Sequence, residues 1–213
     1  MTTILVTPRQ AASILSTAKV LSTGTSKING IDALSIRLDH KNIVVVATDR
    51  FRVVRLTIPA DTSDGYQIAG DPLILRPAVL EQALKMMGKG MDDAPVIKIH
   101  QTADTYEPIS IELTHTGTKV LADSVVGSYP PVERLLEGDR YDDIYSGVLL
   151  DAGRLATLAL LRLPGETPAK AKVQAWELTT KNSDNGRKNS PLMFTRSEGE
   201  NSLEYLLQPN LIR

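Results

Sequence analysis

Hydrophobic residues along the first 60 positions change from a helical to a strand-like spacing. After a short apolar run at 4–6, apolar residues recur every three or four positions between Arg9 and Leu21. This spacing predicts a helix with one buried face, beginning at Thr7-Pro8. Three runs of alternating or β-branched residues then predict strands over 33–38, 43–47 and 51–58. The predicted order is one strand, one helix and three strands.

The same order recurs twice. The second copy has a strand at 73–75, a helix over 76–89 and strands at 95–100, 109–114 and 119–126. The third copy has a strand at 147–150, an N-cap at Asp151, a helix over 153–163 and strands at 172–178, 192–195 and 203–208. The period is about 70 residues, so the sequence predicts an α+β fold of three strand-helix-three-strand repeats.

The charged segment 133–145 separates the second copy from the third, as a linker between domains does. We therefore predict a domain over 1–137 with two repeats and a domain over 138–213 with one. The polar segment 179–190 of the third copy is rich in turn formers, and it is either a long hairpin loop or locally disordered.

Composition excludes several kinds of chemistry. The chain has 213 residues and no cysteine, which excludes disulfides, thiolate metal sites and cysteine nucleophiles. His40, His100 and His115 are far apart in sequence, and Asp49 has no second carboxylate or Gly-rich phosphate loop near it. We therefore expect no enzyme activity, no metal and no cofactor. The N-terminus lacks a signal-peptide pattern and no apolar run could span a membrane, so we expect a cytoplasmic protein.

Positive charge is concentrated on the predicted helices. Although the whole chain has a net charge of −1, the helices carry seven Lys and Arg residues against two acids. The seven cations are Arg9, Lys19, Arg76, Lys85, Lys89, Arg154 and Arg162. Such a distribution favours one surface that attracts phosphate, without sequence preference, although chance in three short helices is the alternative.

Four short motifs resemble those of one family, the beta subunit of bacterial DNA polymerase III. The stretch V-V-A-T-D-R-F-R-V at 45–53 is similar to the family's V-A-T-D-G-H-R-L, and Ile28-Asn29-Gly30 is similar to its L-N-G. The stretch G-S-Y-P-P-V-E-R-L-L-E at 127–137 is similar to G-R-F-P-D-Y-R-R-V-L-P, and Y-L-L-Q-P-N-L-I-R at 205–213 to the family's C-terminal tail. The resemblance covers the middle domain of those proteins and the C-terminal half of the last one.

The resemblance implies a DNA clamp fold and a sliding clamp, a processivity factor that encircles duplex DNA as a ring and tethers a replicative polymerase. It also implies partners that bind through a short peptide, among them a polymerase and a clamp loader. Family members have six repeats per chain and twelve per ring, so three repeats suggest a homo-oligomer of four chains. An odd number per chain disturbs the alternation of contacts in such a ring, so a modified contact, a different ring or no ring are open alternatives. A shortened, diverged member would suit a viral genome.

In the family, the four segments form a hydrophobic cleft for the partner peptide. Carried over by position, the cleft is lined by Ile28, Thr48, Arg50, Phe51, Arg52, Val53, Pro130, Arg134, Leu135, Leu207, Gln208, Pro209 and Asn210. Arg50 and Phe51 replace a Gly and a His of the family, so the peptide preference is expected to differ. The alternative function is a clamp-like interaction module that binds replication proteins without encircling DNA.

Overall fold

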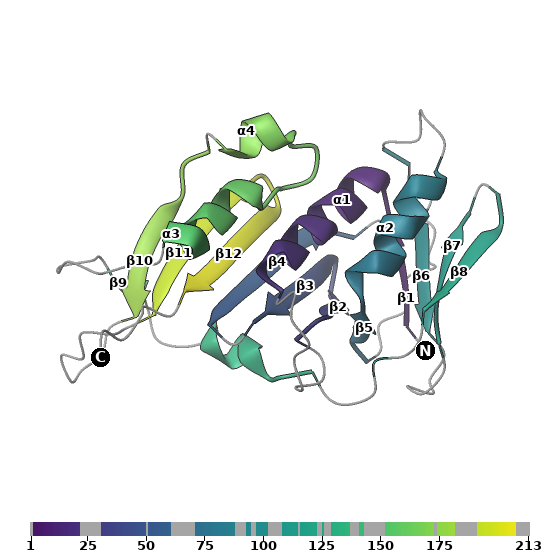
Figure 1. The fold of residues 1–213 in the computed structure, drawn as a ribbon, viewed down its shortest axis with the longest axis horizontal. Helices are drawn as coiled ribbons and strands as arrows, with labels where there is room; N and C mark the ends of the chain where they lie inside the picture. The colour runs from purple at the N-terminus through teal and green to yellow at the C-terminus, as the bar shows by residue number, and fades with distance from the viewer. Residues whose placement is uncertain are drawn as a thin grey trace.

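Three units lie side by side in the structure, a computed structural model (Figure 1). It describes residues 2–21, 31–49, 51–60, 71–87, 93–94, 97–101, 108–114, 116–122, 125, 129–136, 141–142, 152–172, 174–181 and 191–207. Among these residues, no helix combines the length and hydrophobicity needed to cross a bilayer.

Each unit contains a helical segment and a set of antiparallel strands, and the third unit has a second short helix, α4. The first has β1 (Thr2–Val6), α1 (Pro8–Thr17), the 3₁₀ helix η1 (Ala18–Val20), β2 (Leu34–Asp39), β3 (Asn42–Thr48) and β4 (Arg52–Pro59). The second has β5 (Leu73–Leu75), α2 (Pro77–Met86), β6 (Ile97–Gln101), β7 (Ile109–Leu113) and β8 (Thr118–Ala122). After η2 (Val132–Leu135) and β9 (Tyr141–Asp142), the third has α3 (Ala152–Ala156), η3 (Thr157–Leu160), α4 (Pro168–Lys172), β10 (Glu177–Lys181), β11 (Leu192–Glu198) and β12 (Asn201–Leu207).

Local sequence explains where α1 begins. Thr7 accepts a hydrogen bond from the Gln10 backbone N–H through its hydroxyl, and the Gln10 side chain accepts one from the Thr7 N–H. This capping box satisfies two donors that a helix N-terminus otherwise leaves free, and Pro8 fits the first turn because it has no N–H. The predicted start of this helix is therefore confirmed.

The strands form two sheets, and each sheet contains strands of both the first and the second unit. One has the order β1-β6-β7-β8 and the other β5-β2-β3-β4-β12-β11-β10-β9. The first and second units exchange their first strands, since β1 pairs with β6 and β5 pairs with β2. Helices α1 and α2 pack against each other, α1 on β3 and β4 and α2 on β7 and β8. The two units thus share one core.

The third unit joins the first through its last strand. β12 pairs antiparallel with β4, so one sheet runs across the boundary predicted near residue 138. In Figure 1, α3 lies over β11 and β12 on the same side of this sheet as α1. We call this side the helix side and the opposite surface of the eight-stranded sheet its outer face. The division into two domains stays a prediction.

The predicted α+β fold of repeated units is confirmed, and the third unit corrects its details. The strand expected over 172–178 is wrong at its start, because Lys172 ends helix α4 and β10 begins only at Glu177. Thr167 starts α4 by accepting the Lys170 N–H, and proline, alanine and lysine suit a short helix. The helix expected over 153–163 ends at Leu160, its second half in 3₁₀ form, and the chain is already extended at Leu161. The predicted strand 147–150 and Asp151 lie outside the described residues.

Candidate functional site

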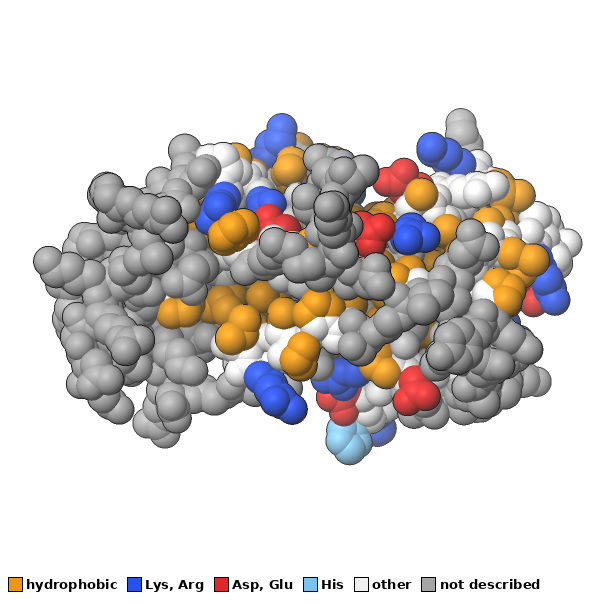
Figure 2. Space-filling view, turned by 60° about the horizontal axis from the view of Figure 1, so that its bottom comes forward, with side chains coloured by type: hydrophobic (Ala, Val, Ile, Leu, Met, Phe, Trp, Pro, Cys, Tyr) orange, Lys and Arg blue, Asp and Glu red, His pale blue; other side chains and the backbone are white. Residues whose placement is uncertain are grey.

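The outer face carries a compact apolar cluster where β4 meets β12. It consists of Val44, Val46, Val53, Met193, Leu206 and Leu136, with Tyr129 and Val132 packed against it. The segment that contains η2 lies over the cluster, and the Tyr129 hydroxyl donates a 3.0 Å hydrogen bond to the Val46 carbonyl oxygen. Figure 2 presents the η2 side of the molecule and shows hydrophobic side chains gathered in a band across its middle. We call these eight residues the outer-face cluster.

Polar residues continue the outer face beyond this cluster. Arg55 on β4 and Glu204 on β12 are cross-strand neighbours and form a two-pronged ion pair, in which Arg55 Nη2 lies 2.9 Å from Glu204 Oε1. A hollow of about 460 Å³ extends from this pair over β11 to β10. Along both β4 and β12, the outer face therefore changes from apolar to charged within two residues.

The turn between β3 and β4 is held by its own side chains. One Asp49 carboxylate oxygen accepts the N–H groups of Phe51 and Arg52, at 3.0 and 2.9 Å, and the Thr48 hydroxyl donates to the Arg52 carbonyl oxygen at 2.8 Å. Asp and Thr in such positions replace ladder hydrogen bonds that the turn interrupts. Phe51 is left 52% exposed, and the Arg154 guanidinium of α3 lies 4.6 Å from its ring centroid.

Arg52 points away from the outer face, toward the helix side. Besides its ion pair with Asp49 at 2.6 Å, its guanidinium donates to Thr157 Oγ1 at 2.9 Å and to the Val20 carbonyl oxygen at 3.1 Å. Val20 belongs to η1 and Thr157 to η3, so this side chain joins the first and third units.

A second buried contact lies beside this joint, within the third unit. The Tyr205 hydroxyl donates a 2.8 Å hydrogen bond to the Arg154 carbonyl oxygen, and Tyr205 is fully buried. Burial raises the pKa of Tyr205 to about 12, because the phenolate form would lose its hydration. The hydroxyl therefore remains a neutral donor at any physiological pH.

Two of the predicted cleft residues, Arg52 and Leu207, face the helix side of the sheet, away from the outer-face cluster. Opposite residues of an antiparallel pair face the same side of a sheet, and Arg52 pairs with Leu207. Leu207 is 1% exposed and belongs to the main core on the helix side. Leu206, which precedes Leu207 on β12, faces outward instead, and so does Met193, which lies opposite Leu206 on β11.

Apart from Phe51, whose ring contacts Arg154 of α3, the other predicted cleft residues that the structure describes belong to the strands and the η2 segment that form the outer-face cluster. Val53 is part of it, Thr48 is its buried neighbour, and Pro130 is partly buried. Arg134 and Leu135 are exposed, whereas Leu136 packs inward. Ile28, Arg50, Gln208, Pro209 and Asn210 lie outside the described residues.

Sequence analysis missed Leu206, Met193, Val44 and Val46, although a signal was present. On β12, Leu206 shares its face with Ser202 and Glu204, and on β11, Met193 shares its face with Thr195 and Ser197. Every second residue of a strand lies on the same face. An apolar residue among polar residues at these alternate positions therefore marks an apolar spot on an otherwise polar face.

The predicted DNA-facing cations come from helices that lie on the helix side. Lys19 and Lys85 are exposed, and Lys89 lies outside the described residues. Two of the others are engaged by acids, since Arg9 lies 3.0 Å from Asp93 and Arg76 3.1 Å from Asp32.

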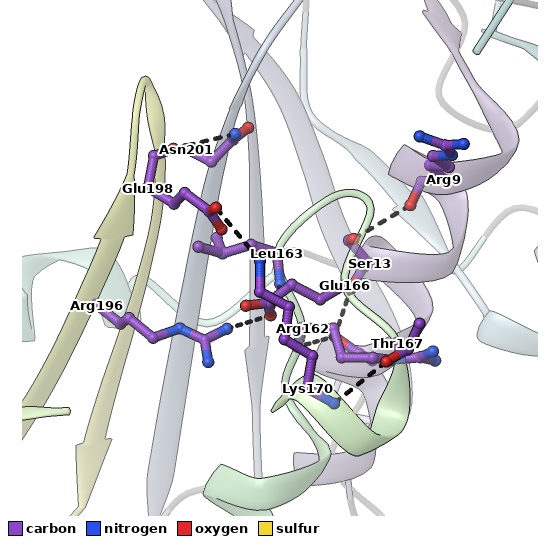
Figure 3. A network of polar contacts seen from close by, with 11 residues as sticks. Arg9, Ser13, Arg162, Leu163, Glu166, Thr167, Lys170, Arg196, Glu198 and Asn201 are labelled. Atoms are coloured by element: carbon purple, nitrogen blue, oxygen red, sulfur yellow. Dashed lines mark hydrogen bonds and ion pairs between the residues drawn. The ribbon is translucent and has the colours of Figure 1, made fainter. Parts of the chain in front are cut away.

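Arg9 and Arg162, from the first and third units, line one small hollow of about 120 Å³ (Figure 3). The Arg162 N–H donates to Ser16 Oγ at 3.0 Å, which ties the segment after η3 to α1. Glu166 also lines the hollow and is paired at 2.5 Å with Arg196, whose guanidinium lies 4.9 Å from the Trp176 ring centroid. Within the described part of the chain, no group of His, Asp or Glu side chains could hold a metal ion.

No protein-family model and no curated protein matches this sequence. Its fold, however, matches solved structures with high similarity. A DNA polymerase III beta subunit from Eubacterium rectale has a TM-score of 0.68 at 11% identity, with 98% of this chain and 65% of that chain covered. The beta chain from Streptococcus pneumoniae has a TM-score of 0.65 at 14% identity, covering 99% and 65%. The sliding clamp from Pseudomonas aeruginosa has a TM-score of 0.65 at 11% identity, covering 99% and 67%.

The chain spans just under two thirds of the length of the first two of these proteins. At 11–15% identity the likeness concerns the fold, which it identifies over almost all of this chain. The predicted resemblance is therefore confirmed at that level: the chain has the fold of the DNA polymerase III beta subunit, the bacterial sliding clamp.

Proposed function

We propose that this protein is a DNA sliding clamp, a non-catalytic processivity factor that encircles duplex DNA as an oligomeric ring and tethers a replicative polymerase. The observation that carries the proposal is the arrangement of cations within the clamp fold. α1, α2 and α3 lie on the helix side, and Arg9 and Arg162 of different units line the same hollow there. A ring with this side inward would place these charges around the duplex.

The small number of cations on the helix side favours movement along DNA over tight binding at one place. Each neutralised phosphate adds to affinity by releasing counterions, so a surface with a handful of Lys and Arg residues binds weakly and without sequence preference. Attraction to backbone phosphates alone favours no sequence and no fixed register, so the protein would slide along the duplex.

The proposed partner site is the outer-face cluster together with Phe51. Both lie at the joint of the first and third units. The cluster itself is buried beneath the η2 segment, and Phe51 and Leu135, each 52% exposed, are the apolar side chains beside it that a partner can reach. A short peptide of a polymerase or clamp loader with an apolar anchor would suit such a surface.

The test is topological. The protein is loaded on nicked circular DNA and on the same DNA after linearisation, and retention is measured at moderate salt. A clamp remains on the circle and is lost from the linear form through its ends. Equal retention on both forms, or none on the circle at any loading condition, would contradict the proposal.

A second candidate is an interaction module that binds replication proteins without encircling DNA. The ion pairs Arg9–Asp93 and Arg76–Asp32 favour it, because they reduce the charge that this side offers to phosphate. For such a module, variants Lys19→Gln and Lys85→Gln would leave all measured interactions unchanged. A clamp bearing both substitutions would show a weaker and less salt-dependent affinity for duplex DNA.

A further inference from the structure

The outer side of β8 is a free sheet edge in the described part of the chain. β8 is the last strand of the order β1-β6-β7-β8 and, among the described strands, pairs with β7 alone. Every second residue of such a strand directs its N–H and C=O away from the sheet, where they can pair with another strand. Leu121 on β8 is 67% exposed, the largest value among the exposed large hydrophobic residues that the structure describes.

The other three sheet edges offer less to a partner. β5 contains three residues and β9 two. On β1, Thr3 and Leu5 are buried. β8 has five residues and no proline, and its one charge, Lys119, is drawn along the sheet toward Glu112, 3.5 Å away on β7. The devices that usually protect an edge are therefore sparse on β8.

The joint within the chain provides a template for pairing this edge. β4 is the last strand of the first unit and β12 the last strand of the third, and they pair antiparallel. The helices of both units then lie on one side of a continuous sheet (Figure 1). β8 is the last strand of the second unit and lacks the equivalent partner among the described strands. We infer that β8 pairs antiparallel with β8 of a second copy of this chain.

The alternation of side chains selects the register of this pair. Thr118, Val120 and Ala122 face the core and Lys119 and Leu121 face outward, so only residues of equal parity can lie opposite each other. Centring the pair on Lys119 would place Lys119 opposite the partner's Lys119, and two like charges in direct opposition are unfavourable. Centring it on Leu121 would leave Thr118 and Lys119 opposite residues beyond the strand. Centring it on Val120 uses all five residues and places each Leu121 opposite the partner's Lys119.

This contact deepens the proposed function, on which its role in a ring rests. Within the chain, the second and first units meet through helices and exchanged strands, and the first and third meet through last strands. A contact between two β8 strands is again of the last-strand kind. The two kinds of contact, through exchanged strands and through last strands, therefore keep alternating across the two-fold axis of the pair. A head-to-tail arrangement of chains with three units each cannot keep this alternation.

Solution mass and a pair of matched variants test the contact. The wild-type chain is expected at twice 23.2 kDa at micromolar concentration, without DNA. Leu121→Lys opposes Lys119 of the partner at two symmetric positions and should raise the dimer dissociation constant at least about tenfold. Leu121→Glu, an equally polar change at the same exposed position, should preserve the dimer, and salt should weaken it. A monomeric wild type, or equal effects of the two variants, would overturn the inference.

Cysteine crosslinking tests the register, because the chain contains no cysteine. In the proposed pair, Val120→Cys lies opposite itself at a Cα separation of about 4.5–5.5 Å, which suits a disulfide. Leu121→Cys lies diagonally from its copy, about 7–8 Å away, and should crosslink poorly. Efficient crosslinking at 121 but not at 120 would refute this register.

Failure of the contact and failure of the clamp function give different results. A dimer that responds to Leu121→Lys but is not retained on circular DNA supports the contact and contradicts the clamp. Retention on circular DNA by a Leu121→Lys variant that is monomeric off DNA contradicts the role of this contact and leaves the clamp standing.

Discussion

Replacing Arg52 by Met should destabilise the joint between the first and third units strongly. The Arg52 side chain is 15% exposed and that of its partner Asp49 11%. Removing one member of a buried ion pair costs about 3–5 kcal/mol, because the other charge is left without its partner. Asp49 keeps two backbone N–H donors, while Thr157 and the Val20 carbonyl lose one donor each. We therefore expect a loss of about 3 kcal/mol in the free energy of unfolding.

Urea denaturation at pH 7 measures this loss, and Arg37→Met is the matched control. Arg37 and Asp39 also form an Arg–Asp pair, at 2.9 Å, but with 24% and 45% of their side chains exposed. Such a surface pair contributes about 0–1 kcal/mol. The double variant Asp49→Asn/Arg52→Met should lose less than the two single losses combined, since no charge remains unpaired. If Arg52→Met costs no more than Arg37→Met, Arg52 does not hold the joint.

Two further predictions concern single side chains. Leu207→Ala should lower the free energy of unfolding by about 2–5 kcal/mol in urea denaturation, because it opens a cavity in the core. Phe51→Ala should lower it by about 1 kcal/mol or less, because Phe51 is half-exposed and contacts the Arg154 guanidinium. Similar losses for the two variants would contradict the assignment of Leu207 to the core and Phe51 to the surface. Desolvation, followed by the nearby positive charge of Lys98, lowers the pKa of His100 below its usual 6.5, so the unfolded chain binds a proton more readily than the folded one. The stability that neutral His100 contributes is thus present above about pH 6.5 and is lost as the pH falls. The melting temperature of wild type should drop more than that of His100→Gln between pH 7 and pH 5, and parallel curves would refute this.

The sequence alone determined the parts of this protein that depend on neighbouring residues. The Thr7-Gln10 capping box and Pro8 start α1 where its apolar spacing begins, and Thr48 and Asp49 hold the turn that separates β3 from β4. The recurrence of one helix and three strands identified the repeat, and four motifs identified the clamp fold. These features rest on hydrogen bonds and periodicities within a few residues, which the sequence contains directly.

Only the tertiary structure decided which residues of the candidate site face together. Leu206 and Leu207 are adjacent and equally apolar, and pairing of β12 with β4 places one on the outer face and the other in the core. Likewise Arg52 looked like part of a partner cleft, yet its donors reach Val20 and Thr157, which are 32 and 105 residues away in sequence. A strand's register against a distant partner follows from the packing of both units. The alternation along β12 hints that Leu206 faces outward, but it does not say which residues of β4 and β11 lie opposite, and a shift of one residue would exchange the two faces.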